Sequence, residues 1–235
     1  MLTLLAQINL SDLPNNDVFP GKGLLQFFIL NAEDANHYKV VFHKEIDSSV
    51  ALPDIAQVVP SSLMSESVVF TSDSGQQIEA VNPYWGEAGF PTQGELALKF
   101  SKEYESANLT EDCFHEEFKK AATQLNIPLP EDFDNVYDID FLNEEDEESP
   151  LNEYYTGSSH KLFGRPYFIQ RDCRDSDDEI LLLQIDSAED TEIFGETNEN
   201  NFIEIGDVGI MHFFIKKDDL KKLDFSNIDY DWGSH

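Results

Sequence analysis

Two short blocks of sequence occur twice in this chain, in the same order. Residues 4–9 (LLAQIN) are matched by residues 181–186 (LLLQID), and residues 23–29 (GLLQFFI) by residues 209–215 (GIMHFFI). The loop between the two blocks is nine residues longer in the second copy. A repeat this widely spaced is not a solenoid, whose periods are roughly 20–50 residues. We therefore predict an internal duplication within a single domain.

The predicted domain spans residues 1–235, with a first repeat at about 2–30 and a second at about 180–216. Each repeat is expected to form strand, loop and strand, because its apolar runs are short and bounded by Gly, Pro, Asn or Asp. Further strands are expected at 37–43, 67–71, 96–100 and 162–169. A helix is expected at 114–125, capped by Thr110, and a short one at 218–223. Strands dominate, so the predicted fold class is α+β, mostly antiparallel sheet built from the duplicated strand-loop-strand unit, with few helices.

Acidic residues outnumber basic ones by 47 to 15, which gives a formal charge of −32. Such a charge disfavours binding to nucleic acid and to anionic lipid. The acid is densest at residues 131–153, a stretch without Lys or Arg that is expected to be a solvated connector. The sequence has no apolar run long enough to span a bilayer, so no membrane association is expected. Cys113 and Cys173 lack a metal or redox spacing, which favours a cytoplasmic location.

Polar residues inside the repeated strands are the first candidate site. Gln7 and Gln184 occupy equivalent positions, with Asn9 and Asp186 two residues further along the same strand face. A buried amide needs hydrogen-bond partners, so these residues predict a polar network between the repeats. Ligand binding by the same residues is the alternative reading.

Sequence motifs for catalysis, metal binding or cofactor binding are not found. His37, His43, His160 and His212 lack the spacing of a metal site, and neither cysteine lies in a nucleophile signature. Each His is more typical of a half-buried strand or turn residue. No cofactor or metal is therefore predicted.

Several segments together resemble a known bacterial family. In the first half these are residues 4–14 and 23–29; in the second they are 160–167, 182–186, 206–209, 213–215 and 220–225, with Trp232. They resemble the YwqG-like proteins. The resemblance implies a duplicated, mostly antiparallel α+β domain whose biochemical function is undefined. Ile205 stands where that family tends to have Trp, and the family usually has a segment before the first strand, so we expect the natural gene product to be longer.

Two functions of different classes follow from these observations. The first is an uncharacterised cytosolic, non-enzymatic module that uses its acidity to bind a basic protein. Its expected interaction surface comprises Tyr84, Trp85, Glu144, Glu145, Glu147 and Glu148. The alternative is a hydrolase or transferase with its site in a cleft between the repeats. Acidity that serves only solubility or adaptation to salt is a third explanation.

Overall fold

The structure is a computed structural model of the chain. It describes residues 2–46, 90–92, 97–105, 108–130, 133–136, 157–176, 178–187 and 203–235, together with the backbone of 67–71 and 77–81. Within these ranges the fold is α+β with mostly antiparallel sheet and few helices, which confirms the predicted class.

The first sheet contains β1 (Thr3–Asn9), β2 (Leu24–Ile29) and β3 (Tyr38–His43), paired antiparallel in chain order. Burial alternates along β2, where Leu25, Phe27 and Ile29 have no exposed surface. This alternation places one face of the sheet on the core and leaves the other face, with Leu24, Gln26 and Phe28, only partly buried. A short 3-10 helix, η1 (Leu10–Asp12), follows β1.

The second sheet contains β6 (Glu179–Asp186), β7 (Ile210–Lys216) and β8 (Ile228–Gly233), again antiparallel and in chain order. Its central strand differs from β2 because β7 is buried on both faces, from Ile210 to Ile215. α3 (Lys217–Lys222) directly follows β7. A separate hairpin joins β4 (Ser67–Thr71) to β5 (Gln77–Val81).

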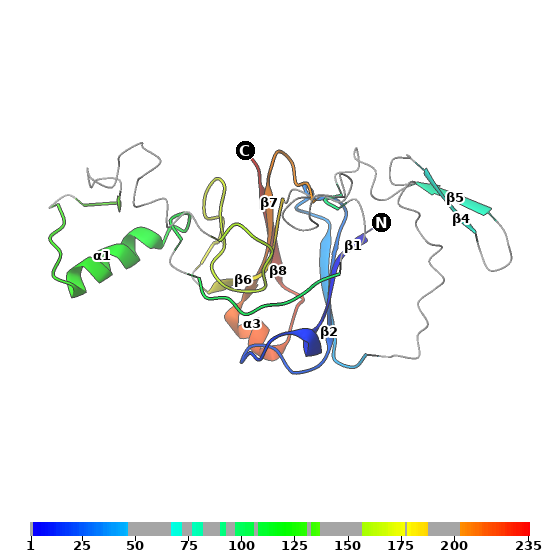
Figure 1. The fold of residues 1–235 in the computed structure, drawn as a ribbon, viewed down its shortest axis with the longest axis horizontal. Helices are drawn as coiled ribbons and strands as arrows, with labels where there is room; N and C mark the ends of the chain where they lie inside the picture. The colour runs from blue at the N-terminus through cyan, green and yellow to red at the C-terminus, as the bar shows by residue number, and fades with distance from the viewer. Residues whose placement is uncertain are drawn as a thin grey trace.

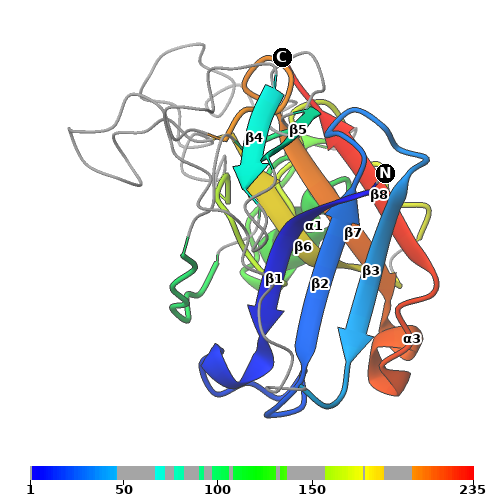
Figure 2. The same ribbon diagram turned by 90° about the vertical axis from the view of Figure 1, so that its right-hand side faces the viewer.

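The two three-stranded sheets pack face to face, with β1–β3 in front of β6–β8 in Figure 2. Side chains from both sheets fill the space between them. Phe27 of β2 contacts Phe213 of β7 edge to face, with ring centroids 5.1 Å apart. Tyr38 of β3 stacks on Tyr230 of β8 at 5.3 Å. The described part of the space between the sheets is therefore packed core.

Two tyrosine hydroxyls tie the sheets together in opposite directions. Tyr38 donates a hydrogen bond to the Ile228 carbonyl oxygen at 2.6 Å, and Tyr230 donates one to the Ala32 carbonyl oxygen. Burial raises the pKa of Tyr230, and the neighbouring Asp231 raises it further. Both bonds satisfy hydroxyls that would otherwise be costly at the edge of an apolar core.

Tyr230→Phe is expected to lower the free energy of unfolding by about 1–2 kcal/mol, because the Ala32 carbonyl loses its buried partner. Tyr104→Phe is the matched control, since Tyr104 is 92% exposed, and should change stability by less than about 0.5 kcal/mol. Chemical denaturation at pH 7 measures both. A Tyr230→Phe variant as stable as the parent chain would contradict this role for the hydroxyl.

Both three-stranded sheets contain a register shift at equivalent positions of the repeated blocks. The β1–β2 pairing shifts register between Leu4 and Ala6, and the β6–β7 pairing shifts between Leu181 and Leu183, which are the equivalent positions in the repeated blocks. A β-bulge is a specific local feature. On this correspondence we propose that the two halves are copies of one unit. A relative with the bulge in only one sheet would argue against that proposal.

α1 (Phe114–Gln124) lies to one side of the two sheets (Figure 1). Its apolar face contacts Phe133 and Val136, which belong to the predicted acidic connector and are buried; of residues 131–153, only 133–136 lie within the described ranges. The expectation that Thr110 caps this helix is wrong. Cys113 precedes α1 without a side-chain cap, and the Thr110 hydroxyl instead accepts a hydrogen bond from the Phe168 N–H at 3.0 Å.

Two predicted strands are also wrong. Residues 97–100 pair with no strand within the described ranges. The segment 162–169 forms no strand either. Only the preceding residue, Lys161, pairs, through a single bridge to Gln184. Positive φ angles at Phe163 and Gly164 (60° and 85°) then turn the chain away, and Pro166 has no N–H to continue a ladder. Within the described ranges, neither α1, with 11 residues, nor α3, with 6, is long and apolar enough to cross a membrane.

Candidate functional site

The outer face of the second sheet is covered by residues 157–176, and Gln184 on β6 holds this cover in place. The Gln184 side chain has no exposed surface. Its Nε2 donates hydrogen bonds to the carbonyl oxygens of Gly157 (2.7 Å) and Ser159 (2.9 Å), and its Oε1 accepts one from the Tyr167 N–H (2.9 Å). A buried amide that makes three such bonds fixes the cover to the sheet.

His212 on β7, directly opposite Gln184 in register, binds the other backbone group of the same residue, Tyr167. Its Nε2 lies 2.9 Å from the Tyr167 carbonyl oxygen. A carbonyl only accepts, so Nε2 carries the proton and Nδ1 is left with a lone pair. That Nδ1 is buried and has no hydrogen-bond partner among the described residues. His212 thus presents a fixed, unused acceptor.

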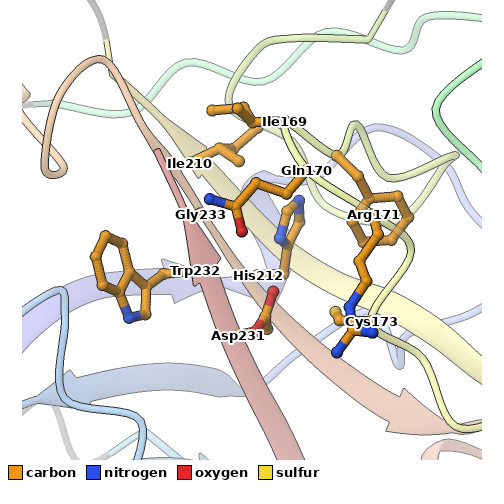
Figure 3. A pocket seen from close by; sticks show the side chains of 10 residues that line it. Ile169, Gln170, Arg171, Cys173, Ile210, His212, Asp231, Trp232 and Gly233 are labelled. Atoms are coloured by element: carbon orange, nitrogen blue, oxygen red, sulfur yellow. The ribbon is translucent and has the colours of Figure 1, made fainter. Parts of the chain in front are cut away.

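A pocket of about 150 Å³ opens between the cover and the ends of β7 and β8. Figure 3 shows that the side chains of Gln170, His212 and Asp231 turn toward one another in its centre. Arg171 lies on one side of the pocket beside Cys173, while the Trp232 ring lies on the other face of β8, packed against the core between the sheets. The pocket therefore faces away from the packed space between the two sheets.

Burial keeps two titratable groups of this pocket in their neutral forms. Burial lowers the pKa of His212 to about 4, an effect that the hydrogen bond to Tyr167 partly offsets. Burial also raises the pKa of the Cys173 thiol, which hydrogen-bonds the Asp231 carboxylate. An activated cysteine nucleophile needs the opposite arrangement, a lowered thiol pKa beside a protonated imidazole. The chemistry that fits these groups is hydrogen bonding by neutral side chains.

The low pKa of His212 predicts that acid destabilises the protein. The unfolded chain binds a proton near pH 6.5 and the folded chain only near pH 4, so this contribution to stability is present above pH 6.5 and is lost as the pH falls toward 4. The expected loss from His212 between pH 7 and pH 5 is about 2 kcal/mol. His212→Gln keeps a donor for Tyr167 and should remove this part of the pH dependence.

Denaturation at a series of pH values measures the effect. His235→Gln is the control, since His235 is exposed and its replacement should leave the slope of stability against pH unchanged. A His212→Gln variant with the same slope as the parent chain would show that His212 is not the group responsible.

An ion-pair cluster anchors the turn before α1 to the cover. Glu111 is 4% exposed and pairs with Arg165 at 2.9 Å and with Arg174 at 3.1 Å. Arg174 also forms a two-pronged pair with Asp172 and lies over the Phe168 ring, 5.6 Å from its centroid. Arg165 and Arg174 are therefore engaged in holding the structure together.

A family model for a domain of unknown function, DUF1963, matches residues 1–233. The chain belongs to the DUF1963 family. No curated protein matches the chain. Membership agrees with the sequence resemblance at the level of a family without an assigned function, and the narrower YwqG-like grouping stays an expectation.

In this DUF1963 domain Gln7, Asn9 and Gln184 have separate hydrogen-bond partners. Gln7 is exposed, and its Oε1 accepts a hydrogen bond from Gln26 Nε2 at 2.6 Å. Asn9 accepts from the Ser11 N–H and thereby caps η1. The Asp186 N–H donates to His160 Nδ1 at 3.2 Å. Gln7 and Gln184 therefore share a strand position but differ in burial and in partners.

The predicted interaction surface of the DUF1963 domain, at 84–85 and 144–148, lies outside the described residues. Within the described ranges, no group of three or more His, Cys, Asp or Glu side chains is arranged to hold a metal ion.

Sequence reasoning missed Gln170, Cys173 and Asp231 as members of one site. Residues 228–233 carried a usable signal, because Ile, Tyr and Trp alternate there with two Asp residues. That alternation predicts a strand with one apolar and one acidic face, which is β8. The approach of Cys173 to Asp231 across 58 positions carried no local signal.

Proposed function

We propose that this DUF1963 protein is a non-enzymatic binding module of the cytoplasm whose acidic surface takes a basic protein as partner. The observation that carries the proposal is the way in which positive charge is distributed. All 15 Lys and Arg residues fall within the described ranges. Three of them, Lys161, Arg165 and Arg174, form ion pairs at the join between the cover and the α1 region.

Those three cations therefore do little to offset the acidic surface. The formal charge of −32 would attract a basic protein over long range and accelerate their encounter. The two cysteines are free thiols, which suits a reducing compartment. The neutral His212 and Cys173 in the pocket support recognition in preference to nucleophilic catalysis.

The enzyme alternative lacks a specific observation in its favour. It places a site in a cleft between the two repeats, and the described space between the sheets is filled by core side chains such as Phe27 and Phe213. The pocket opens on the opposite face of the second sheet, beneath the cover.

The test is capture of partners from the cells that naturally express the protein. The full chain is compared with a variant in which Glu144, Glu145, Glu147 and Glu148 are changed to Gln. We expect the parent chain to retain a protein of high isoelectric point at low salt. Binding should weaken by about tenfold or more between 50 and 300 mM salt, because exposed charges are screened beyond about 8–10 Å.

The control variant removes the same amount of charge elsewhere, at four exposed acids: Asp12 and Asp17 to Asn, and Glu33 and Glu116 to Gln. Slower association in the first variant and not in the control would place the contact at 144–148. Retention that is indifferent both to salt and to these replacements would overturn the proposal.

A further inference from the structure

We propose that the pocket between the cover and β8 binds a primary alkylammonium group, presented by a lysine side chain of the basic partner. This inference rests on the proposed function and specifies which chemical group of the partner is recognised. It comes from three acceptors that converge in the pocket, one of which is buried and unpaired.

The buried acceptor is Nδ1 of His212. The side chain is 1% exposed, and the bond from Nε2 to the Tyr167 carbonyl fixes both the tautomer and the ring orientation. A buried polar atom without a partner costs free energy. A ligand that donates a hydrogen bond to this Nδ1 recovers that cost, whereas a ligand with only acceptors does not.

Two further acceptors face the same space. Gln170 donates from Nε2 to the Ser234 carbonyl at 3.1 Å, which leaves its Oε1 for the pocket. The Asp231 carboxylate, on β8, supplies the third acceptor and a negative charge. An ammonium group has three donors and one positive charge, which matches this set in both number and sign. A phosphate or carboxylate ligand would face repulsion from all three.

The size and walls of the pocket fit an alkyl chain. Phe168, Ile169 and Ile210 contribute apolar surface around the three acceptors. A cavity of about 150 Å³ in another protein holds a ligand of six carbon atoms, and the end of a lysine side chain has four methylene carbons and one nitrogen. The walls therefore suit the stem while the acceptors suit the head.

Other charges near His212 also act on a bound cation. Arg171 lines the pocket and opposes the ligand, while Lys161, Arg174 and Asp172 act on His212 electrostatically from the cover. Lys161 and Arg174 are neutralised by ion pairs with Glu105 and Glu111. Removal of the Arg171 charge should therefore strengthen binding of the cation. Arg171→Gln is the variant expected to gain affinity.

The experiment titrates n-butylammonium chloride into the full chain and follows the His212 ring and Gln170 side-chain amide resonances by NMR. Nα-acetyl-lysine N-methylamide is the second probe, and n-butanol is the uncharged control of similar shape. We expect saturable shifts with both amines at millimolar concentration and none with n-butanol. Asp231→Asn should weaken binding by about tenfold or more, and Arg171→Gln should strengthen it a few-fold.

The gain with Arg171→Gln keeps the test valid if Asp231→Asn fails to fold. Absence of saturable shifts with either amine, or equal binding of n-butanol, would overturn the inference. Binding of n-butylammonium with exclusion of the lysine derivative would overturn lysine as the source of the group. The proposed function can fail separately from this inference. If the Asp231→Asn variant still captures a basic partner in a salt-dependent way, lysine binding in the pocket is refuted and the acidic binding module is not.

Discussion

Replacing Gln184 by Leu is expected to lower the free energy of unfolding by about 3 kcal/mol. The Leu side chain has a similar volume, but it cannot satisfy the three groups that the amide now binds: the Tyr167 N–H and the carbonyl oxygens of Gly157 and Ser159. Stranding each buried group costs roughly 1–3 kcal/mol, less what water recovers when the cover loosens. Urea denaturation followed by tryptophan fluorescence measures the change.

The chain contains its own control for this experiment. Gln7 holds the equivalent strand position in the first sheet, is exposed and bonds Gln26 on the sheet surface. Gln7→Leu should therefore cost less than about 1 kcal/mol. Equal effects at the two positions would mean that burial beneath the cover does not distinguish them, and the structural account of the cover would be wrong.

A second large effect is expected at Glu111. Glu111→Gln preserves shape but removes the charge that two guanidinium groups share, those of Arg165 and Arg174. Removing one partner of a buried ion pair costs about 3–5 kcal/mol, because the remaining charge is left uncompensated. Arg165 keeps Glu117 and Arg174 keeps Asp172, so we expect the lower end of that range, about 3 kcal/mol.

Glu116→Gln provides the comparison for Glu111→Gln. Glu116 lies nearby, in the first turn of α1, and is exposed, so its replacement should change stability by no more than about 0.5 kcal/mol. Hydrogen exchange adds a second measurement. Amides of residues 165–174 should lose protection in Glu111→Gln before those of β7 do, because the cover depends on the cluster and the sheet does not. Unchanged protection of the cover would contradict this role for Glu111.

The repeated blocks allowed much of the fold to be predicted from the sequence. LLAQIN and LLLQID became β1 and β6, and the two FFI-containing blocks became β2 and β7, because short apolar runs between turn residues carry strand formation locally. The α1 helix was predicted for a similar reason, from apolar residues spaced along one face. The helix cap was not predicted correctly, because the Thr110 hydroxyl accepts a hydrogen bond from the Phe168 N–H, which is 58 residues further along the chain.

The candidate site was harder to predict because its geometry depends on contacts between distant residues. Gln184 was singled out as a polar residue in an apolar strand, but its partners at 157, 159 and 167 are set by how the cover folds back. His212 had no motif around it, and its unpaired Nδ1 follows from a single carbonyl, that of Tyr167. Local patterns do not encode such pairings.

The central claim is that the pocket presents an unprotonated His212 Nδ1 held in place by the Tyr167 carbonyl. Long-range ¹H–¹⁵N NMR of the full chain, titrated from pH 7.5 to pH 4, reads the tautomer and the pKa of this ring directly. The account predicts the Nε2–H tautomer throughout, with protonation only near pH 4. An Nδ1–H tautomer, or a titration midpoint near the ordinary value of about 6.5, would contradict it.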